Sequence, residues 1–208
     1  MARTWALLIA VTAAVAAALV MAGAGYDRRA LAGQRVLVCG ASMGIGAEVA
    51  LNYARGGARV ALAARSEGRL RAVAAAAAAA GAAEVAVLVA DFGTVAGAEA
   101  AVAGAVAAFG GLDVVVLNHI AAMPVGPLSE APSPPSEVLP RLFAVNMFSY
   151  VYIAAAAMPS LVASRGALCV VSSIAGLTGV PLVAPYAATK VRGLCVAAQG
   201  GRQAAERA

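Results

Sequence analysis

Short apolar runs rich in valine alternate with longer alanine-rich stretches from Gly33 onward, and this alternation leaves few folds open to the chain. Uninterrupted apolar runs are typical of strands buried on both faces of a parallel sheet, and the stretches between them suit crossover helices. The expected strands are residues 35–39, 59–63, 85–90, 114–118 and 167–172, and the expected helices are residues 45–55, 67–80, 95–109 and 136–163. The pattern predicts an α/β fold, a Rossmann-type doubly wound parallel sheet, with strand order 3-2-1-4-5 if the sheet follows the dinucleotide-binding plan.

The N-terminal residues 1–25 follow another pattern. Residues 5–24 carry no charge and are almost wholly apolar, and about 20 such residues cross a bilayer as a helix. A signal-anchor is favoured because the core of a cleavable signal peptide is usually shorter, but Ala22-Gly-Ala24 also has the spacing of a signal-peptidase site. Arg28 and Arg29 outnumber Arg3, so the arginine count alone would leave the following domain in the cytosol.

Composition excludes several classes of function. The net charge is +5, but the arginines are scattered and not clustered with aromatic residues, which argues against a nucleic-acid partner. His119 is the only histidine and has no neighbouring ligand cluster, so we expect no metal. Cys39 and Cys169 lie in apolar runs and are expected to be buried, reduced thiols.

A glycine-rich turn, Gly40-Ala-Ser-Met-Gly44-Ile-Gly46, separates the first expected strand from the first expected helix. Gly40 lets the chain turn, while Gly44 and Gly46 let the backbone and the helix N-terminus approach a pyrophosphate. The alternative is a turn that only connects a strand to a helix. Residues 33–208 are therefore expected to form one dinucleotide-binding domain.

The end of the second strand indicates which dinucleotide is bound. A fold that prefers NAD places an acidic residue there to hold the ribose 2′-hydroxyl, whereas this chain has Arg65 followed by Ser66. A guanidinium group pairs with a 2′-phosphate, so the sequence predicts NADP(H). Asp91, after the third strand, would either accept a hydrogen bond from the adenine amino group or cap the following helix.

Tyr186 and Lys190 are four residues apart and share one helix face. A free phenol titrates near pH ~10, and an adjacent ammonium group lowers its pKa by favouring the phenolate. Tyr186 is thus predicted to be the general acid in ketone reduction and the general base in alcohol oxidation. Ser173 would hydrogen-bond the reacting oxygen, and Asn146 would hold a water that relays protons to Lys190.

These residues resemble the short-chain dehydrogenase/reductase family, and within it the branch of 11-beta-hydroxysteroid dehydrogenase type 1 and its type 1-like relative. The similarity runs from about Gly33 to Gly193. The stretches that carry it are the glycine-rich turn, Ala64-Arg-Ser66, Gly110-Gly-Leu-Asp-Val-Val-Val-Leu-Asn-His-Ile120, Val145-Asn-Met-Phe-Ser-Tyr150, Val170-Val-Ser-Ser-Ile-Ala-Gly176 and Tyr186-Ala-Ala-Thr-Lys190.

The resemblance implies an oxidoreductase that transfers hydride between NADP(H) and a hydrophobic, steroid-like ketone or secondary alcohol. It implies a homodimer, anchored once in the endoplasmic reticulum membrane with its domain in the lumen; a secreted protein is the alternative. The implied catalytic residues are Ser173, Tyr186, Lys190 and Asn146, and the implied cofactor contacts are Gly40, Ser42, Met43, Gly44, Ile45, Gly46, Arg65, Ser66, Asp91, Asn118, His119, Ile120, Tyr186 and Lys190.

The chain departs from the family pattern at three places. Cys39 replaces a threonine, and Met43 replaces a lysine that assists 2′-phosphate binding, so the NADP preference depends on Arg65 and Ser66. The chain also ends 18 residues after Lys190, where the family continues with two strands and a substrate lid. A C-terminally truncated form is therefore expected, and a non-catalytic protein that binds a cofactor or a partner is the alternative function.

Overall fold

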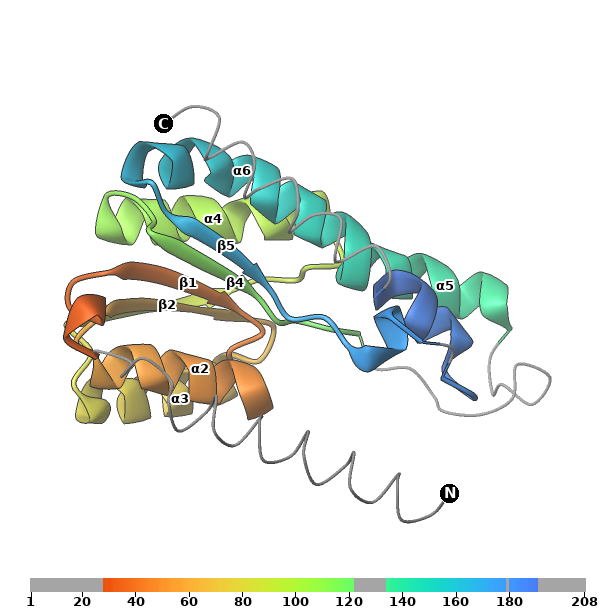
Figure 1. Ribbon diagram of the computed structural model, residues 1–208, viewed down its shortest axis with the longest axis horizontal. Coiled ribbons are helices and arrows are strands. Elements are labelled where there is room, and N and C mark those ends of the chain that lie inside the picture. The colour runs from red at the N-terminus through yellow and green to blue at the C-terminus, as the bar shows by residue number, and fades with distance from the viewer. Residues whose placement is uncertain (1–27, 122–133, 179, 191–208) are drawn as a thin grey trace, which may run out of the picture.

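The computed structural model describes residues 28–121, 134–178 and 180–190 (Figure 1). The predicted membrane segment, residues 5–24, lies outside the described residues. The residues after Lys190 also lie outside them. The fold and the candidate site below are built from the described part alone.

Parallel strands form a single sheet in the order β3-β2-β1-β4-β5, which confirms the predicted order. The strands are β1 (Arg35–Cys39), β2 (Arg59–Ala64), β3 (Glu84–Val89), β4 (Val114–Leu117) and β5 (Ala167–Val170). Val36 of β1 lies opposite Val60 of β2 on one side and Val114 of β4 on the other. The chain that follows β1 therefore emerges where the strand order reverses, and open α/β sheets bind ligands in that crevice.

Helices cover both faces of the sheet (Figure 1). The helices are α2 (Gly44–Arg55) and α3 (Glu67–Ala80) on one face, and α4 (Val95–Phe109) and α6 (Ser149–Ser164) on the other. Val36 and Val38 pack toward α2 and α3, whereas Leu37 and Cys39 pack toward α4 and α6. Because both faces are covered, β1 shows no alternation of polar and apolar residues.

The helix predicted over residues 136–163 forms, but it is not continuous. α5 (Pro135–Phe143) is followed by a π-helical turn, η3 (Ala144–Phe148), before α6 begins. Single π-helical turns frequently occur at functional sites. This one buries Asn146. Among the described residues, Ser136–Ser164 is the one helical stretch apolar enough to cross a membrane, a property shared by core helices that pack on a sheet as α6 does.

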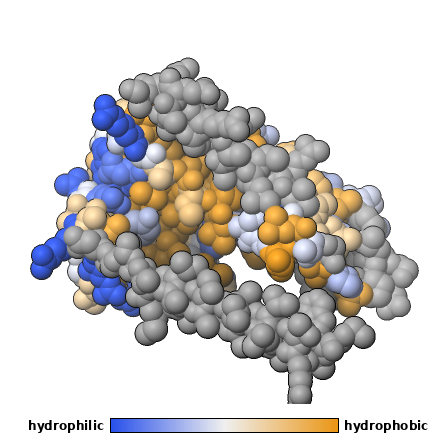
Figure 2. All heavy atoms as spheres, viewed as in Figure 1, coloured by the Kyte–Doolittle hydropathy of each residue, from blue (hydrophilic) through white to orange (hydrophobic). Residues whose placement is uncertain are grey.

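β5 is an edge strand of the described sheet, and its side chains are less buried than those of β1. Ala167 and Cys169 are exposed, and Leu168 and Val170 are half-buried. The prediction of a buried Cys169 is therefore wrong, while Cys39 in β1 is buried as expected. The edge position causes this difference. Figure 2 shows hydrophilic side chains gathered at the end of the molecule where the strands begin, with apolar surface over its middle.

Candidate active site

The turn after β1 is fixed by contact with the chain that follows β4. Gly40 has a φ of +86°, and a Cβ at this position would lie 2.7 Å from both the Cα and the backbone nitrogen of His119. Backbone atoms cannot move aside as a flexible side chain can. The Gly40 N–H also donates to the carbonyl oxygen of Ala63 (2.8 Å), which ties the turn to β2. This position therefore requires glycine.

The two later glycines of the turn serve different purposes. A Cβ on Gly46 would overlap the carbonyl oxygen of Gly40, so α2 packs directly on the turn. Gly44 has a φ of +58°, and a Cβ there would meet nothing within 4 Å, so open space lies in front of it. Met43, at the N-cap of α2, gives the helix no side-chain cap. The first N–H groups of α2 are thus available to an anion.

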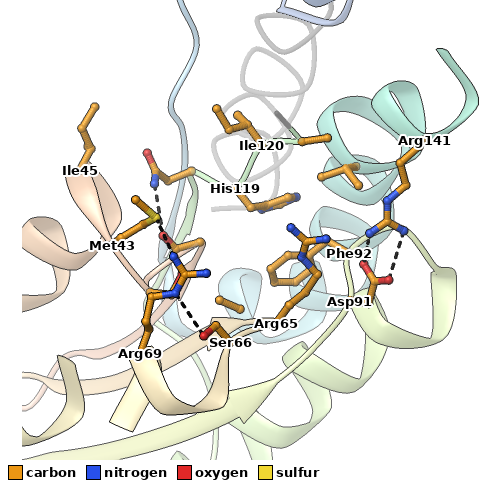
Figure 3. A pocket seen from close by; sticks show the side chains of 16 residues that line it. Met43, Ile45, Arg65, Ser66, Arg69, Asp91, Phe92, His119, Ile120 and Arg141 are labelled. Atoms are coloured by element: carbon orange, nitrogen blue, oxygen red, sulfur yellow. Dashed lines mark hydrogen bonds and ion pairs between the residues drawn. The ribbon is translucent and has the colours of Figure 1, made fainter. Parts of the chain in front are cut away.

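A cleft of about 590 Å³ lies beside this turn, at the carboxyl ends of β1, β2 and β4 (Figure 3). Most of the predicted cofactor contacts line it, namely Gly40, Ser42, Met43, Ile45, Arg65, Ser66, Asp91, Asn118, His119 and Ile120. Gly44, Gly46, Tyr186 and Lys190 are not among the lining residues. The structure therefore brings predicted contacts from four separate segments of the sequence to one cleft, and Arg141 and Val145 line it from a fifth segment.

Two arginines extend into the cleft where β2 ends and α3 begins (Figure 3). Arg65 is exposed and stands where an acidic residue would favour NAD. Arg69 was not predicted. Its Nε donates to Ser66 Oγ (3.1 Å), and its Nη1 contacts the Met43 sulfur (3.4 Å). The sequence did offer one signal for Arg69. This residue falls in the first turn of the helix predicted over residues 67–80, directly after Arg65 and Ser66.

Asp91 also lines the cleft and is paired with Arg141 of α5 at distances of 2.7 Å and 3.1 Å. The Arg141 guanidinium and the Gly93 N–H hold the pKa of the Asp91 carboxyl below its usual range. The capping alternative for Asp91 is wrong, because Thr94 caps α4 by accepting from the Gly97 N–H (3.0 Å). Sequence reasoning missed Arg141 because the pair depends on how α5 packs.

His119 is a buried part of the cleft wall and stacks on Phe92, with ring centroids 4.2 Å apart. Ser149 Oγ donates to the carbonyl oxygen of Val145 (2.6 Å), so it accepts from His119 Nε2 (2.7 Å). This assigns the ring proton to Nε2. Burial and the charge of Lys190 lower the pKa of His119 to about 3. The wall is therefore neutral, and the charge of the cleft comes from its arginines and Asp91.

The predicted catalytic pair lies on a helix whose described part covers residues 184–190. Lys190 is only 2% exposed, and its Nζ donates to the carbonyl oxygen of Val171 (3.0 Å). Nζ lies 5.8 Å from the ring centroid of Tyr186, so the two side chains are neighbours as the spacing predicts. Burial lowers the pKa of Lys190.

Tyr150 connects this pair to the cleft, and sequence reasoning did not assign it a role. Its hydroxyl lies 3.5 Å from Lys190 Nζ and donates to the carbonyl oxygen of His119 (2.8 Å). Tyr150 is fully buried on α6. A continuous set of contacts thus joins the lysine to the wall of the cleft.

Ser173 and Asn146 complete the predicted catalytic group. Ser173 follows β5 and accepts from the Ala175 N–H (3.2 Å) at the start of the short helix η4 (Ile174–Gly176). Asn146 accepts from the Ala121 N–H (2.7 Å) and donates to Thr189 Oγ1 (3.2 Å). Asn146 therefore ties the helix of residues 184–190 to the chain after β4, and a water between it and Lys190 stays a prediction.

The cleft suits a phosphorylated dinucleotide. Three guanidinium groups and one carboxylate line it, so its described lining residues carry a net charge of +2. The uncapped N-terminus of α2 faces the same region, with open space in front of Gly44. Helix N-termini and arginines both favour phosphate groups. The residues present thus fit a dinucleotide whose phosphates lie along the glycine-rich turn and the end of β2.

Comparison with known proteins identifies the family of the chain. The family model described as short chain dehydrogenase matches residues 34–206. The Hydroxysteroid 11-beta-dehydrogenase 1-like protein of Xenopus tropicalis is 38% identical over 192 residues, which cover 90% of this chain and 63% of that protein. Its namesake in Homo sapiens is 38% identical over 165 residues, which cover 79% of this chain and 51% of that protein. The chain thus spans between half and two thirds of the length of these two relatives.

Solved structures share the fold. An alcohol dehydrogenase from the archaeon Thermococcus sibiricus, complexed with 5-hydroxy-NADP, superimposes with a TM-score of 0.75 at 26% identity over 82% of this chain and 71% of that one. A short-chain type dehydrogenase/reductase from Mycobacterium marinum gives a TM-score of 0.77 at 26% identity over 87% of this chain and 73% of that one.

Proposed function

The chain belongs to the short-chain dehydrogenase family, and we propose that it is an NADP-dependent oxidoreductase that interconverts a hydrophobic, steroid-like ketone and its secondary alcohol. The observation that carries this proposal is the placing of Lys190 beside Tyr186, with Tyr150 linking the lysine to a cleft lined by arginines. A core lysine with no catalytic task would be a costly feature, because burial opposes its charge.

The residues of the pair have complementary tasks. When bound, the nicotinamide supplies or accepts the hydride. Tyr186 gives its hydroxyl proton to the carbonyl oxygen during reduction and recovers it during oxidation. The Lys190 ammonium favours the phenolate that remains on Tyr186. Ser173 would donate a hydrogen bond to the reacting oxygen and so orient the carbonyl.

The preference for NADP is supported by the end of β2. Arg65 and Ser66 line the cleft there, and the one carboxylate among the described lining residues, Asp91, is paired with Arg141. A 2′-phosphate would meet a positive charge at this place and no free acid.

A titration of both nicotinamide cofactors tests the preference. We expect the wild-type chain to bind NADPH at least about tenfold more tightly than NADH, and Arg65→Ala to remove most of that difference, because a charged hydrogen bond contributes roughly 1.5–3 kcal/mol. Equal affinities in the wild type would contradict the NADP assignment. So would an Arg65→Ala variant that keeps the full preference.

The substrate, the location and the assembly are proposed from the relatives and from the N-terminal sequence. The matched relatives are named for hydroxysteroid dehydrogenation, which supports a steroid-like substrate.

Residues 1–25 would anchor the domain of residues 33–208 in the endoplasmic reticulum membrane, with that domain in the lumen. Protease protection in sealed microsomes tests the location, and digestion without detergent would place the domain in the cytosol. Sedimentation in detergent tests the proposed homodimer, which a purely monomeric species would contradict.

A further inference from the structure

The first turn of α3 holds a cation, Arg69, as well as the acidic Glu67. Ser66 is the N-cap of α3 and makes no side-chain cap, so its side chain does not satisfy the first N–H groups of the helix, which carry a partial positive charge. Arg69 is the third residue of this helix. Glu67, the acidic residue of the first turn, has its carboxylate engaged with Arg71 (2.6 Å). The start of α3 therefore combines a helix N-terminus with a guanidinium group that no carboxylate balances.

Within the described part of the chain, the hydrogen bonds of Arg69 are both to neutral groups. They are the Ser66 hydroxyl and the Met43 thioether, and a thioether is a weak acceptor. Across residues 28–121, 134–178 and 180–190, neither Arg65 nor Arg69 forms an ion pair. By contrast Arg141, the third arginine of the cleft, is paired with Asp91 on two bonds.

Arg65 and Arg69 both extend into the cleft, and Arg65 lies between Arg69 and the Asp91–Arg141 pair (Figure 3). Arg65 directly follows the last residue of β2, and Arg69 lies in the first turn of α3. Two unpaired guanidinium groups and an uncapped helix N-terminus together favour an anion with several oxygens and more than one charge. A phosphate monoester has both properties, because it carries close to two negative charges at neutral pH.

We propose that Arg69 is a specificity-determining residue that binds the ribose 2′-phosphate of NADP together with Arg65. This inference rests on the proposed function, and it names a second phosphate ligand in a place where the sequence offered only Arg65 and Ser66. Met43 is 62% exposed and flexible, so its thioether can yield its contact with Arg69 to a phosphate oxygen. Ser66 Oγ meanwhile accepts a hydrogen bond from Arg69 Nε and so orients the Arg69 guanidinium group.

Arg59 provides a control. It is the first residue of β2, at the opposite end of the strand from the cleft, is exposed, and lies 3.9 Å from Glu84 at the start of β3. It does not line the cleft. The full chain in detergent micelles is titrated with NADPH and with NADH, using nucleotide fluorescence, in the wild type, Arg69→Ala and Arg59→Ala. Arg69→Ala should weaken NADPH binding by about tenfold and change NADH binding by less than about twofold, because only NADPH carries the 2′-phosphate. Arg59→Ala should leave both affinities unchanged.

The titrations distinguish the role of Arg69 from the proposed preference for NADP. If the wild type prefers NADPH while Arg69→Ala retains that preference in full, Arg69 is not a phosphate ligand although the NADP assignment stands. An equal loss of NADPH and NADH binding in Arg69→Ala would also overturn the inference, since it would indicate damage to the whole cleft. Equal wild-type affinities would overturn the NADP assignment itself.

Discussion

β1 and β5 both lead into the candidate active site, but the residues that follow them are held in different ways. β1 is buried on both faces, and the turn after it is set by contacts of Gly40 with backbone atoms. β5 is an edge strand, and Ser173 after it is half-buried. The proposed cofactor region thus depends on close backbone packing, whereas the proposed catalytic region depends on hydrogen bonds of side chains such as Lys190 and Asn146.

The largest effect is expected from an added methyl group at the turn after β1. Gly40→Ala would place a Cβ 2.7 Å from the His119 backbone at a φ of +86°, so it should lower the free energy of unfolding by roughly 2–5 kcal/mol and abolish NADPH binding. Gly68→Ala is the control, because a Cβ there meets nothing within 4 Å and alanine favours the helix by about 0.5–1 kcal/mol. Urea denaturation and NADPH titration measure both variants. Similar stabilities for the two variants would mean that backbone contact does not fix this turn.

A smaller effect, on reactivity and not on stability, is expected from the two cysteines on these strands. Iodoacetamide should modify Cys169 of β5 in the native protein, because that residue is exposed. Cys39 of β1 is fully buried and burial raises the pKa of its thiol, so it should react only after unfolding. Peptide mapping by mass spectrometry follows the two residues separately. Equal native labelling would remove the distinction between the interior strand and the edge strand.

Local signals were enough to predict the strands and several helix boundaries, whereas the strand order came from the general plan of dinucleotide-binding sheets. α3 and α4 have the predicted bounds. Their ends are marked by Gly81 and Gly110, which adopt the left-handed conformation that often follows a helix. β5 was predicted to reach residue 172 but ends at Val170, which pairs with Leu117, the last residue of β4. Its length is therefore set by its neighbour and not by its own residues.

Contacts between distant segments could not be read from the sequence. The glycine-rich turn follows β1 and Arg65 follows β2. Because these strands are neighbours in the sheet, the strand order is enough to place the two segments together. The ion pair of Arg141 with Asp91 and the hydrogen bond of Tyr150 to His119 depend on how α5 and α6 pack. The π-helical turn between these helices has no signal in the pattern of apolar residues. The residues that line the cleft were thus more predictable than the residues that support them.

Substitution of Tyr186 tests the central claim most directly. In the full chain, Tyr186→Phe should lower kcat for NADPH-dependent reduction of a hydrophobic ketone by roughly 10²–10⁴-fold, because it removes the proton donor. NADPH affinity should stay within about twofold, since Tyr186 does not line the cleft. Tyr152→Phe, on the exposed side of α6, is the control and should change neither value. Unchanged turnover in Tyr186→Phe would contradict the assignment, and NADPH binding by a wild-type chain with no turnover would favour a non-catalytic protein instead.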